Sequence, residues 1–331
     1  MRTLILFLIP LLATHIVTAD DAPRAIPPIQ TYSLVRLDGR LDHLAFDLEK
    51  DHVFVAAPGS SSVAVVDLKL GRMTYVMNNL PRPQGVSVAS DGEHFLIACE
   101  GGGACRFCDR NLLKQVATRD LKTDADNTRY EPSAKRFWVG YGSGALAAFD
   151  DKTLDQVRDI PLPAHPESFQ LETTGKRIFV NLPLVGQIAI IDREKGEVIG
   201  KWEPREAAGN YPMALDEEHH RLIIGCRKPA KVLILDTETG RTMASLDCVP
   251  EADDLFYDAI SRQIIVTGSG GNFTLLKQRK LDQYDLPRAI PTGDGARTSL
   301  LDSASGHLYI AVPHRGEQRA ELRVYDIRKI P

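Results

Sequence analysis

The sequence lacks the excess of basic residues that proteins carry when they bind nucleic acid through its phosphates. Its 331 residues include 40 Lys and Arg against 44 Asp and Glu, which gives a net charge of −4. Phosphate binding needs clustered positive charge. We therefore do not expect nucleic acid as a partner, although two short loop segments, Arg227-Lys228 and His314-Arg315, offer local cationic groups.

The sequence also has few cysteines, and their number is odd. They are Cys99, Cys105, Cys108, Cys226 and Cys248. At least one is unpaired within a monomer, and only Cys99 and Cys105, which flank a glycine loop, are candidates for a bridge. Cys226 and Cys248 fall on strands with a third between them, roughly 10 Å apart and beyond the roughly 7 Å limit for a disulfide. Cys105 and Cys108 match C-x-x-C, but on a strand they point to opposite faces, which argues against a redox or metal site.

Common catalytic motifs are missing too. We find no nucleophile-elbow serine, no zinc-binding helix motif and no phosphate-binding loop. The glycine-rich stretches 101–103 and 268–271 lie between expected strands and are typical of hairpin turns. Nucleotide binding and transfer of phosphate or hydride are therefore not supported.

Long apolar runs are absent outside the first nineteen residues. This segment has a positive Arg2, an apolar core from Leu4 to Leu12, and compact residues at 17–19. This order of features resembles a cleaved secretory signal peptide (residues 1–19). A membrane anchor is disfavoured, because the apolar core is shorter than the about 20 residues that span a bilayer. Residues 20–30 then form a Pro-rich leader. We expect an exported protein, periplasmic or secreted, with no membrane span and, once Arg2 is removed from a chain of −4, a net charge of −5.

What the sequence does contain is a repeat. Seven short β-prone runs start at His52, His94, Arg136, Arg177, Arg221, Gln263 and His307. Successive starts are 41 to 44 residues apart, which is the period of a four-stranded propeller blade. The sequence therefore predicts an all-β fold, a seven-bladed β-propeller over residues 31–331, with an eight-bladed ring as the main alternative.

Each unit shows further strands in the same register. An apolar segment precedes each run, and another follows it, often closing on an aspartate. Turns such as Asp67–Gly71 place a glycine where a hairpin needs a positive φ, so a fourth strand follows. The last unit is too short for its fourth strand, whereas the β-like segment Thr31–Leu37 has no unit of its own. We expect this N-terminal strand to join the last blade and close the ring, which removes an open edge.

These repeats resemble those of the bacterial YVTN-repeat (YncE-like) β-propeller family. The likeness rests on strand-end tetrapeptides such as Phe179–Leu182 and Ile265–Gly268 and on D-x-x-x-G hairpins, and it covers nearly the whole mature chain. No unit carries the literal Tyr-Val-Thr-Asn sequence. The resemblance implies the fold and export but no particular activity. Proteins with similar rings include lactonases and streptogramin-type lyases, whose metal and base residues lie at the mouth of the channel.

Polar residues recur just before each innermost strand, where the ring brings them to one mouth of a central channel. Counting back nine residues from each run aligns His43, Gly85, Asn127, Ser168, Pro212, Asp254 and Thr298. The residues before them are Asp42, Gln84, Asp126, Glu167, Tyr211, Asp253 and Arg297. Such short polar side chains often satisfy only the loop backbone. Here, however, several carboxylates converge, and they repel one another unless positive charge lies between them.

A hard divalent cation, calcium or magnesium, would supply that charge, and so would Arg297 itself. Oxygen ligands for the cation would come from Asp126, Asn127, Glu167 and Asp254, with His43 or His165 beside it. If the protein is an enzyme, His165 and Glu167 are the candidate proton-transfer groups. The candidate ligand-binding residues are His43, Gln84, Tyr211, Arg227, Arg297, His314 and Arg315.

Two functions are compatible with such a mouth. The first is non-catalytic binding of a small-molecule or protein ligand. The alternative is a metal-assisted lactonase, hydrolase or lyase with its site at the same place. A propeller is a scaffold whose role depends on the loops and side chains at one face, so the repeat does not choose between them.

Overall fold

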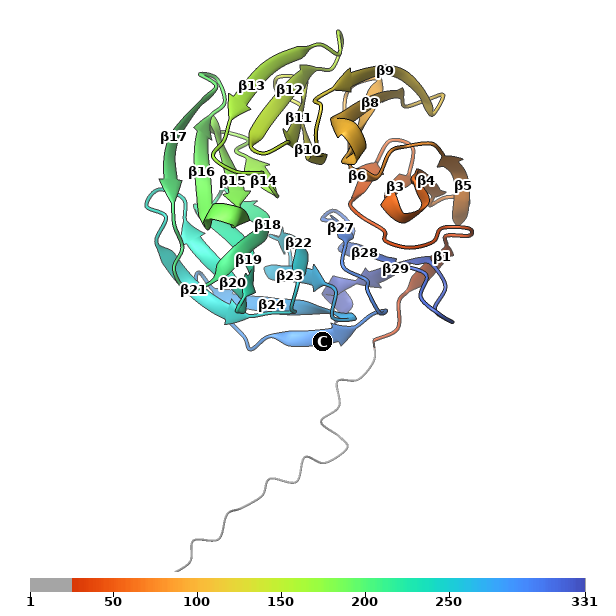
Figure 1. Cartoon of the computed structure of the whole chain (residues 1–331). Coiled ribbons are helices and arrows are strands. Elements are labelled where there is room, and N and C mark those ends of the chain that lie inside the picture. The colour runs from red at the N-terminus through yellow and green to blue at the C-terminus, as the bar shows by residue number, and fades with distance from the viewer. Residues whose placement is uncertain (1–25, 331) are drawn as a thin grey trace, which may run out of the picture.

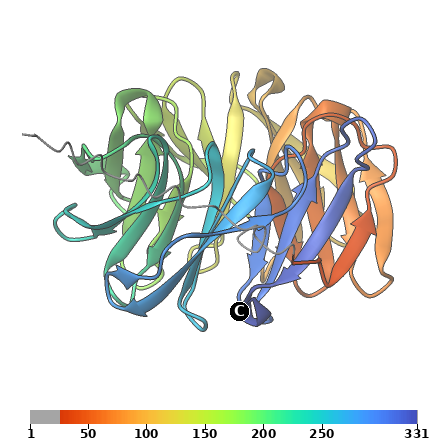
Figure 2. The ribbon, with the colours of Figure 1, turned by 90° about the horizontal axis from the view of Figure 1, so that it is seen from below.

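In a computed structural model, which describes residues 26–330, the repeats form a closed ring of seven antiparallel sheets (Figure 1). Each sheet is one blade. In the first six blades the strands run in chain order from the central channel outward, and in the last blade the N-terminal strand is the outermost one. Figure 2 shows the strands crossing the ring from one face to the other, so the loops gather on two opposite faces. The seven-bladed propeller predicted from the spacing is confirmed, and the eight-bladed alternative is excluded.

The first four blades follow the predicted pattern of four strands each. From the channel outward they are β2 (Leu44–Asp47), β3 (His52–Ala57), β4 (Ser62–Asp67) and β5 (Arg72–Met77); β6 (Pro83–Val88), β7 (His94–Cys99), β8 (Ala104–Asp109) and β9 (Lys114–Asp120); β10 (Ala125–Glu131), β11 (Arg136–Tyr141), β12 (Ala145–Asp150) and β13 (Gln156–Pro161); and β14 (Phe169–Leu171), β15 (Arg177–Leu182), β16 (Gln187–Asp192) and β17 (Glu197–Trp202). Short 3-10 turns are η2 (Pro58–Ser60), η3 (Gly101–Gly103), η4 (Pro183–Val185) and η5 (Ile327–Lys329).

The remaining blades contain one irregularity. Their strands are β18 (Ala208–Asp216), β19 (Arg221–Lys228), β20 (Ala230–Asp236) and β21 (Thr242–Asp247); β22 (Ala252–Asp258), β23 (Gln263–Gly268), β24 (Asn272–Lys280), β25 (Gln283–Tyr284) and β26 (Arg288–Pro291); and β27 (Ser299–Asp302), β28 (His307–Val312) and β29 (Glu321–Asp326). In blade six, β25 and β26 both pair with β24, so the outer strand is split in two.

The N-terminal strand closes the ring as predicted. Strand β1 (Gln30–Ser33) pairs antiparallel with β29, and Tyr32 lies opposite Leu322. The last blade is therefore built from both ends of the domain. The predicted signal peptide and residues 20–25 of the leader lie outside the described residues. Within residues 26–330, no helix is long and apolar enough to cross a membrane.

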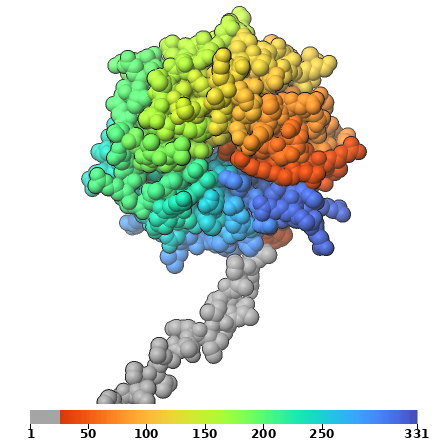
Figure 3. Space-filling model, in the orientation of Figure 1, coloured from red at the N-terminus to blue at the C-terminus, as the bar shows by residue number. Residues whose placement is uncertain are grey.

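The core lies between blades rather than within one layer. Alternate residues of a strand face the two neighbouring blades, and both faces are buried, so the second and third strands are nearly continuous apolar runs. Phe54 of blade one packs on Phe95 of blade two with ring centroids 4.7 Å apart. Figure 3 shows adjacent blades in contact around the ring. Burial of these faces holds neighbouring repeats together.

Ion pairs also join blades on the face where innermost strands end. The acidic residue at the end of an innermost strand accepts hydrogen bonds from an arginine, and this arginine follows the third strand of the next blade. Arg110 Nη2 lies 2.6 Å from Asp47 Oδ1, and both side chains are buried. Arg193 Nε likewise lies 2.8 Å from Glu131 Oε1. These pairs leave no pattern in the repeat from which they could be predicted.

The cysteines are all free, including the two that we considered for a bridge. Cys99 and Cys108 pack in the core between blades one and two, whereas Cys105 packs between blades two and three. Cys99 and Cys105 therefore lie on opposite faces of one blade and cannot meet. The opposite directions predicted for Cys105 and Cys108 are confirmed.

Candidate functional site

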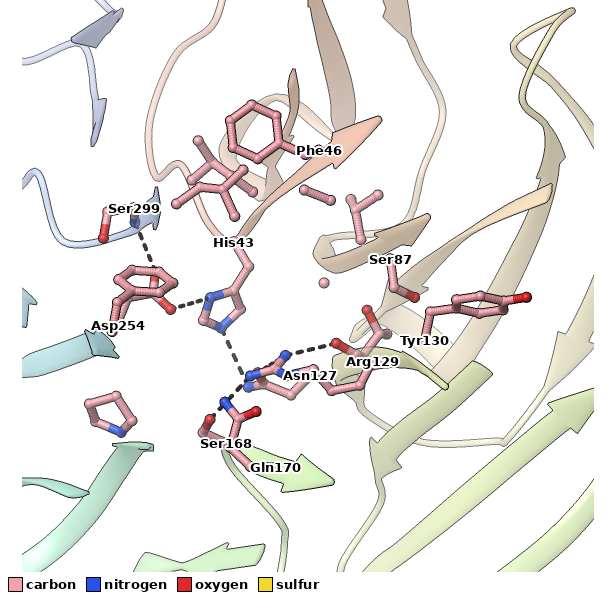
Figure 4. Close-up of a pocket in the computed structure, with 18 of the residues that line it drawn as sticks. His43, Phe46, Ser87, Asn127, Arg129, Tyr130, Ser168, Gln170, Asp254 and Ser299 are labelled. Atoms are coloured by element: carbon pink, nitrogen blue, oxygen red, sulfur yellow. Dashed lines mark hydrogen bonds and ion pairs between the residues drawn. The ribbon is translucent and has the colours of Figure 1, made fainter. Parts of the chain in front are cut away.

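A pocket of about 290 Å³ occupies the central channel, lined by side chains from the innermost strands (Figure 4). Six of the seven aligned positions line it as predicted: His43, Gly85, Asn127, Ser168, Pro212 and Asp254. In the seventh blade, Ser299 lines the pocket instead of Thr298, whose side chain is fully buried. Thr298 nevertheless keeps the aligned position in the blade, because its carbonyl oxygen accepts a hydrogen bond from Ala311 as that of His43 accepts one from Ala56.

In blades two, three, five and six, a register shift lies at the start of the innermost strand, beside the residues that reach the mouth. The innermost strands shift register between Pro83 and Gly85 and between Ala252 and Asp254, with similar shifts in blades three and five. Such bulges re-aim side chains at strand ends. Glycine is required at position 85, because a Cβ there would lie 2.3 Å from the carbonyl oxygen of Asp126.

His43 forms a contact across the channel. Its Nδ1 lies 3.2 Å from Oδ1 of Asp254, and the other oxygen of Asp254 accepts a hydrogen bond from the backbone N–H of Ser299 at 2.8 Å. The amide of Asn127 lies 3.4 Å from Nε2 of His43. Burial opposes the charged imidazole, but Asp254 and two further carboxylates outweigh it and raise the pKa of His43 to about 10. His43 is therefore a cation at neutral pH.

Arg129 also faces the channel, and our sequence analysis missed it. Its Nη1 donates to the carbonyl oxygen of Thr128 at 2.7 Å, and its Nη2 donates to Oγ of Ser168 at 3.3 Å. Its guanidinium carbon lies 5.5 Å from the ring centroid of Phe169. Within residues 26–330, no carboxylate lies within ion-pair distance of Arg129. Burial lowers its pKa, yet a guanidinium keeps its proton in proteins.

A pattern in the sequence could have revealed Arg129. It stands two residues after the aligned Asn127, on the same side of the strand. Equivalent positions in other blades hold neutral residues that also line the pocket: Ala45, Ser87, Gln170 and Phe256. The signal was a single charged residue among neutral ones at these equivalent positions. It was missed because only the residues at the starts of the strands were aligned.

Two hydroxyl groups in the same layer have no hydrogen-bond partner in the described chain. They are Oγ of Ser87 and Oγ1 of Thr128, and both residues are buried while lining the pocket. Buried polar atoms normally have partners in the protein or in bound molecules. Both oxygens are enclosed by the protein, so the group of this layer that faces the channel with a charge is Arg129.

At the mouth above this layer, Asp253 is held by two arginines. Arg297 donates from Nε and Nη2 at 2.5 and 2.6 Å, and Arg227 donates from Nη2 at 2.7 Å. Arg227 also stacks on Tyr211, with its guanidinium carbon 3.4 Å from the ring centroid. Burial opposes ionisation of Asp253, but the two arginines and His43 lower its pKa. The predicted residues Tyr211, Arg227 and Arg297 do converge, but their charges are used within the protein.

The opposite side of the mouth carries His165 and a group of carboxylates. His165 Nδ1 lies 2.5 Å from the carbonyl oxygen of Gly142, and its Nε2 lies 4.0 Å from Oδ2 of Asp126. Burial opposes its charge, but the carboxylate of Asp126, the backbone carbonyl of Gly142, and the charges of Asp124 and Glu167 raise the pKa of His165 to about 9. At neutral pH this imidazole is protonated and donates protons rather than accepting them.

Glu167 differs from its neighbours because its carboxylate has no hydrogen-bond or ion-pair partner among residues 26–330. Burial and the nearby charge of Asp126 raise the pKa of Glu167 to about 7. Asp253, from a blade across the channel, acts in the same direction. Burial likewise raises the pKa of Asp42 to about 7, although Arg40 pairs with it at 2.6 Å.

Of the seven predicted ligand-binding residues, only His43 lines the channel pocket. Tyr211, Arg227 and Arg297 lie around Asp253 at the mouth, and the other three form contacts elsewhere. Gln84 donates its amide hydrogen to Glu100 at the rim. His314 and Arg315 form exposed ion pairs, with Asp38 at 3.1 Å and Asp294 at 3.1 Å. None of the three lines the channel pocket.

The predicted ligands of a divalent cation are spread around the mouth. Within the described chain, no three His, Cys, Asp or Glu side chains are grouped so that they could hold a metal ion. Asp254 is engaged by His43 and by the backbone of Ser299. The positive charge between the acids comes from His43, Arg227 and Arg297. The cation site at Asp126, Asn127, Glu167 and Asp254 stays a prediction.

Comparison with known proteins supports the fold alone. No family model matches the chain, and no curated protein sequence matches it significantly. Among solved structures it is similar to hydrazine synthase of Kuenenia stuttgartiensis, with 16% identity, a TM-score of 0.75 and coverage of 84% of this chain and 94% of that one. A chain of the mitotic checkpoint complex matches at 15% identity, TM-score 0.76 and 98% coverage of both chains. The WD40 repeats of RRP9 match at 11% identity, TM-score 0.73 and coverage of 92% and 100%.

Proposed function

We propose that this propeller is a non-catalytic binding protein whose ligand is a small molecule with a carboxylate, held in the central channel. The observation that carries the proposal is Arg129, a channel-facing guanidinium without a carboxylate partner in the described chain. Arginine pairs with carboxylates through two parallel hydrogen bonds, which gives both affinity and orientation. A ligand carboxylate would supply the missing counter-ion.

The surrounding groups support the same ligand. Figure 4 shows His43, Asn127 and Ser168 pointing toward the channel beside Arg129. His43 is charged, and the amide of Asn127 lies 3.4 Å from its Nε2. Preformed donors of this kind bind an anion without reorganising. The pocket volume of about 290 Å³ suits a small molecule rather than a peptide chain.

Calorimetric titration of the purified protein with acetate, succinate and benzoate tests the proposal. We expect at least one of these acids to bind, and Arg129→Met to weaken binding by about 10- to 100-fold, since a hydrogen bond to a charged group contributes about 1.5–3 kcal/mol. Arg241→Met is the matched control, because Arg241 is exposed on the outer edge of blade five and far from the channel layer. Near-UV circular dichroism checks that each variant is folded. Absence of binding by all three acids, or equal binding by the Arg129 variant, would overturn the proposal.

The export of the protein and its membership of the YVTN-repeat family are part of this proposal. They rest on the N-terminal pattern of residues 1–19 and on the degenerate repeats. The alternative of a metal-assisted hydrolase or lyase stays a prediction. For that alternative, the protonated state of His165 leaves Glu167 as the group suited to accept a proton near neutral pH.

A further inference from the structure

Charge is layered along the channel. The mouth carries six acids, Asp42, Asp124, Asp126, Glu167, Asp253 and Asp254, and the layer below it carries Arg129. A ligand with only a negative charge would pass the acidic mouth to reach Arg129. The acidic mouth therefore favours a ligand whose other end is not negatively charged.

Almost every acid of the mouth already has a cation of its own. Asp42 pairs with Arg40, and Asp254 pairs with His43. Asp253 pairs with both Arg227 and Arg297. The remaining acids lie on the other side of the mouth.

On that side, His165 lies between two aspartates. Its Nδ1 is 3.7 Å from Asp124, and its Nε2 is 4.0 Å from Asp126. Glu167 has no such partner in the described chain. After these internal pairings, one carboxylate at the mouth, Glu167, and one guanidinium below it, Arg129, have no ion-pair partner in the described chain, although Asp254 acts on Arg129, and His165 and Arg227 act on Glu167, from a longer distance.

The two unpaired groups are connected through Ser168. Arg129 donates to Oγ of Ser168, the residue that directly follows Glu167. Consecutive Cα atoms are about 3.8 Å apart. Arg129 therefore contacts the residue next to Glu167, and the two unpaired groups belong to the neighbouring blades three and four.

We propose that the ligand is a zwitterion of the amino-acid type, with its carboxylate on Arg129 and its ammonium group facing Glu167. The proposal rests on the carboxylate site described above and adds the second charge. An ammonium group would pair with Glu167 and also reduce the repulsion between Glu167 and Asp126. The amide of Asn127, which also lines the pocket, lies beside Arg129 in the same channel.

The experiment compares matched ligands that differ only in the ammonium group. Glycine, β-alanine, γ-aminobutyrate and 5-aminovalerate are titrated beside acetate, propionate, butyrate and valerate, with the corresponding alkylamines as a third series. In the unmodified protein at pH 8, we expect one zwitterion to bind at least about 10-fold more tightly than its acid, which corresponds to about 1.4 kcal/mol. The best chain length reports the distance between the two charges.

Variants separate the two halves of the site. Glu167→Gln should abolish the preference for the zwitterion while leaving the affinity for the simple acid unchanged or higher, whereas Arg129→Met should weaken both. Glu251→Gln removes the same charge from the rim, where Glu251 lies 3.7 Å from Arg227, and should preserve the preference. If acids bind but no zwitterion binds more tightly, or if Glu167→Gln keeps the preference, the zwitterion proposal is wrong and the carboxylate site stands. If no acid, zwitterion or amine binds, both proposals fail.

Discussion

Replacing Glu167 by Gln should stabilise the ligand-free protein, and the gain should depend on pH. The pKa of this carboxyl is raised from its ordinary 4.5 to about 7, first by burial and then by Asp126. A raised pKa in the folded state means that its contribution to stability is present below pH 4.5 and is lost as pH rises through 7. Glutamine resembles the protonated acid and does not suffer that loss. The variant should therefore match the parent at pH 4 and exceed it above pH 7.

The magnitude follows from the shift. About 2.5 pKa units at 1.36 kcal/mol each set an upper limit of about 3.4 kcal/mol. Glu167 is only partly buried at a wet mouth, and screening by water reduces this to about 1–2 kcal/mol. For a domain of this size, such a gain raises the melting temperature by a few degrees. The groups that face Glu167 and titrate or screen with it are Asp126, His165, Asp253 and Arg227.

Thermal unfolding followed by calorimetry at pH 4, 5.5, 7 and 8.5 measures the effect. Glu197→Gln, at an exposed position of the outer strand β17, is the matched control and should show no pH-dependent gain. An equal gain at pH 4 and pH 8.5 would point to better packing instead of charge. A loss of stability at pH 8.5 would show that Glu167 has a cationic partner and would contradict the electrostatic argument.

Two further predictions concern the ring and its export. Arg110→Met should destabilise the protein by about 3–5 kcal/mol, because it leaves the buried carboxylate of Asp47 without its arginine, while the double change Asp47→Leu with Arg110→Met should recover most of the loss in urea unfolding. A double variant no more stable than the single one would refute this account. For export, N-terminal sequencing of the protein expressed with its own first residues in a bacterium should give a mature chain that begins at Asp20, and retention of Met1 in the cytoplasm would show that residues 1–19 are not a signal peptide.

The fold was predictable because propeller repeats leave a regular trace in one sequence. Each blade buries two faces, so the runs that start at His52 and its equivalents stay apolar and recur at a fixed period. The closing strand was predictable from an incomplete last unit and the unassigned segment near Thr31. The split outer strand of blade six was not predictable, because β25 and β26 are short and depend on pairing with β24.

The site was predictable in position but not in chemistry. Counting residues placed His43, Asn127 and Asp254 in the channel, because equivalent positions in a ring share one axis. The spacing of the repeats could not show which acids would form ion pairs within the protein, since Arg227 and Arg297 reach Asp253 from different blades. Sequence spacing likewise placed His314 and Arg315 on the correct face without showing that they pair outward, away from the channel.

The function proposed here depends on where the ring departs from its own symmetry. Seven identical repeats would place seven identical side chains around the axis. If these were neutral hydroxyls, water alone would satisfy their hydrogen bonds. In this channel the second layer carries a charge on blade three alone, at Arg129, while Ala45 and Phe256 stand at equivalent positions. The unpaired acid comes from the adjacent blade four, at Glu167. Two opposite charges on neighbouring blades define a direction for a bound molecule, and this is what gives a symmetric scaffold a means of selecting one ligand.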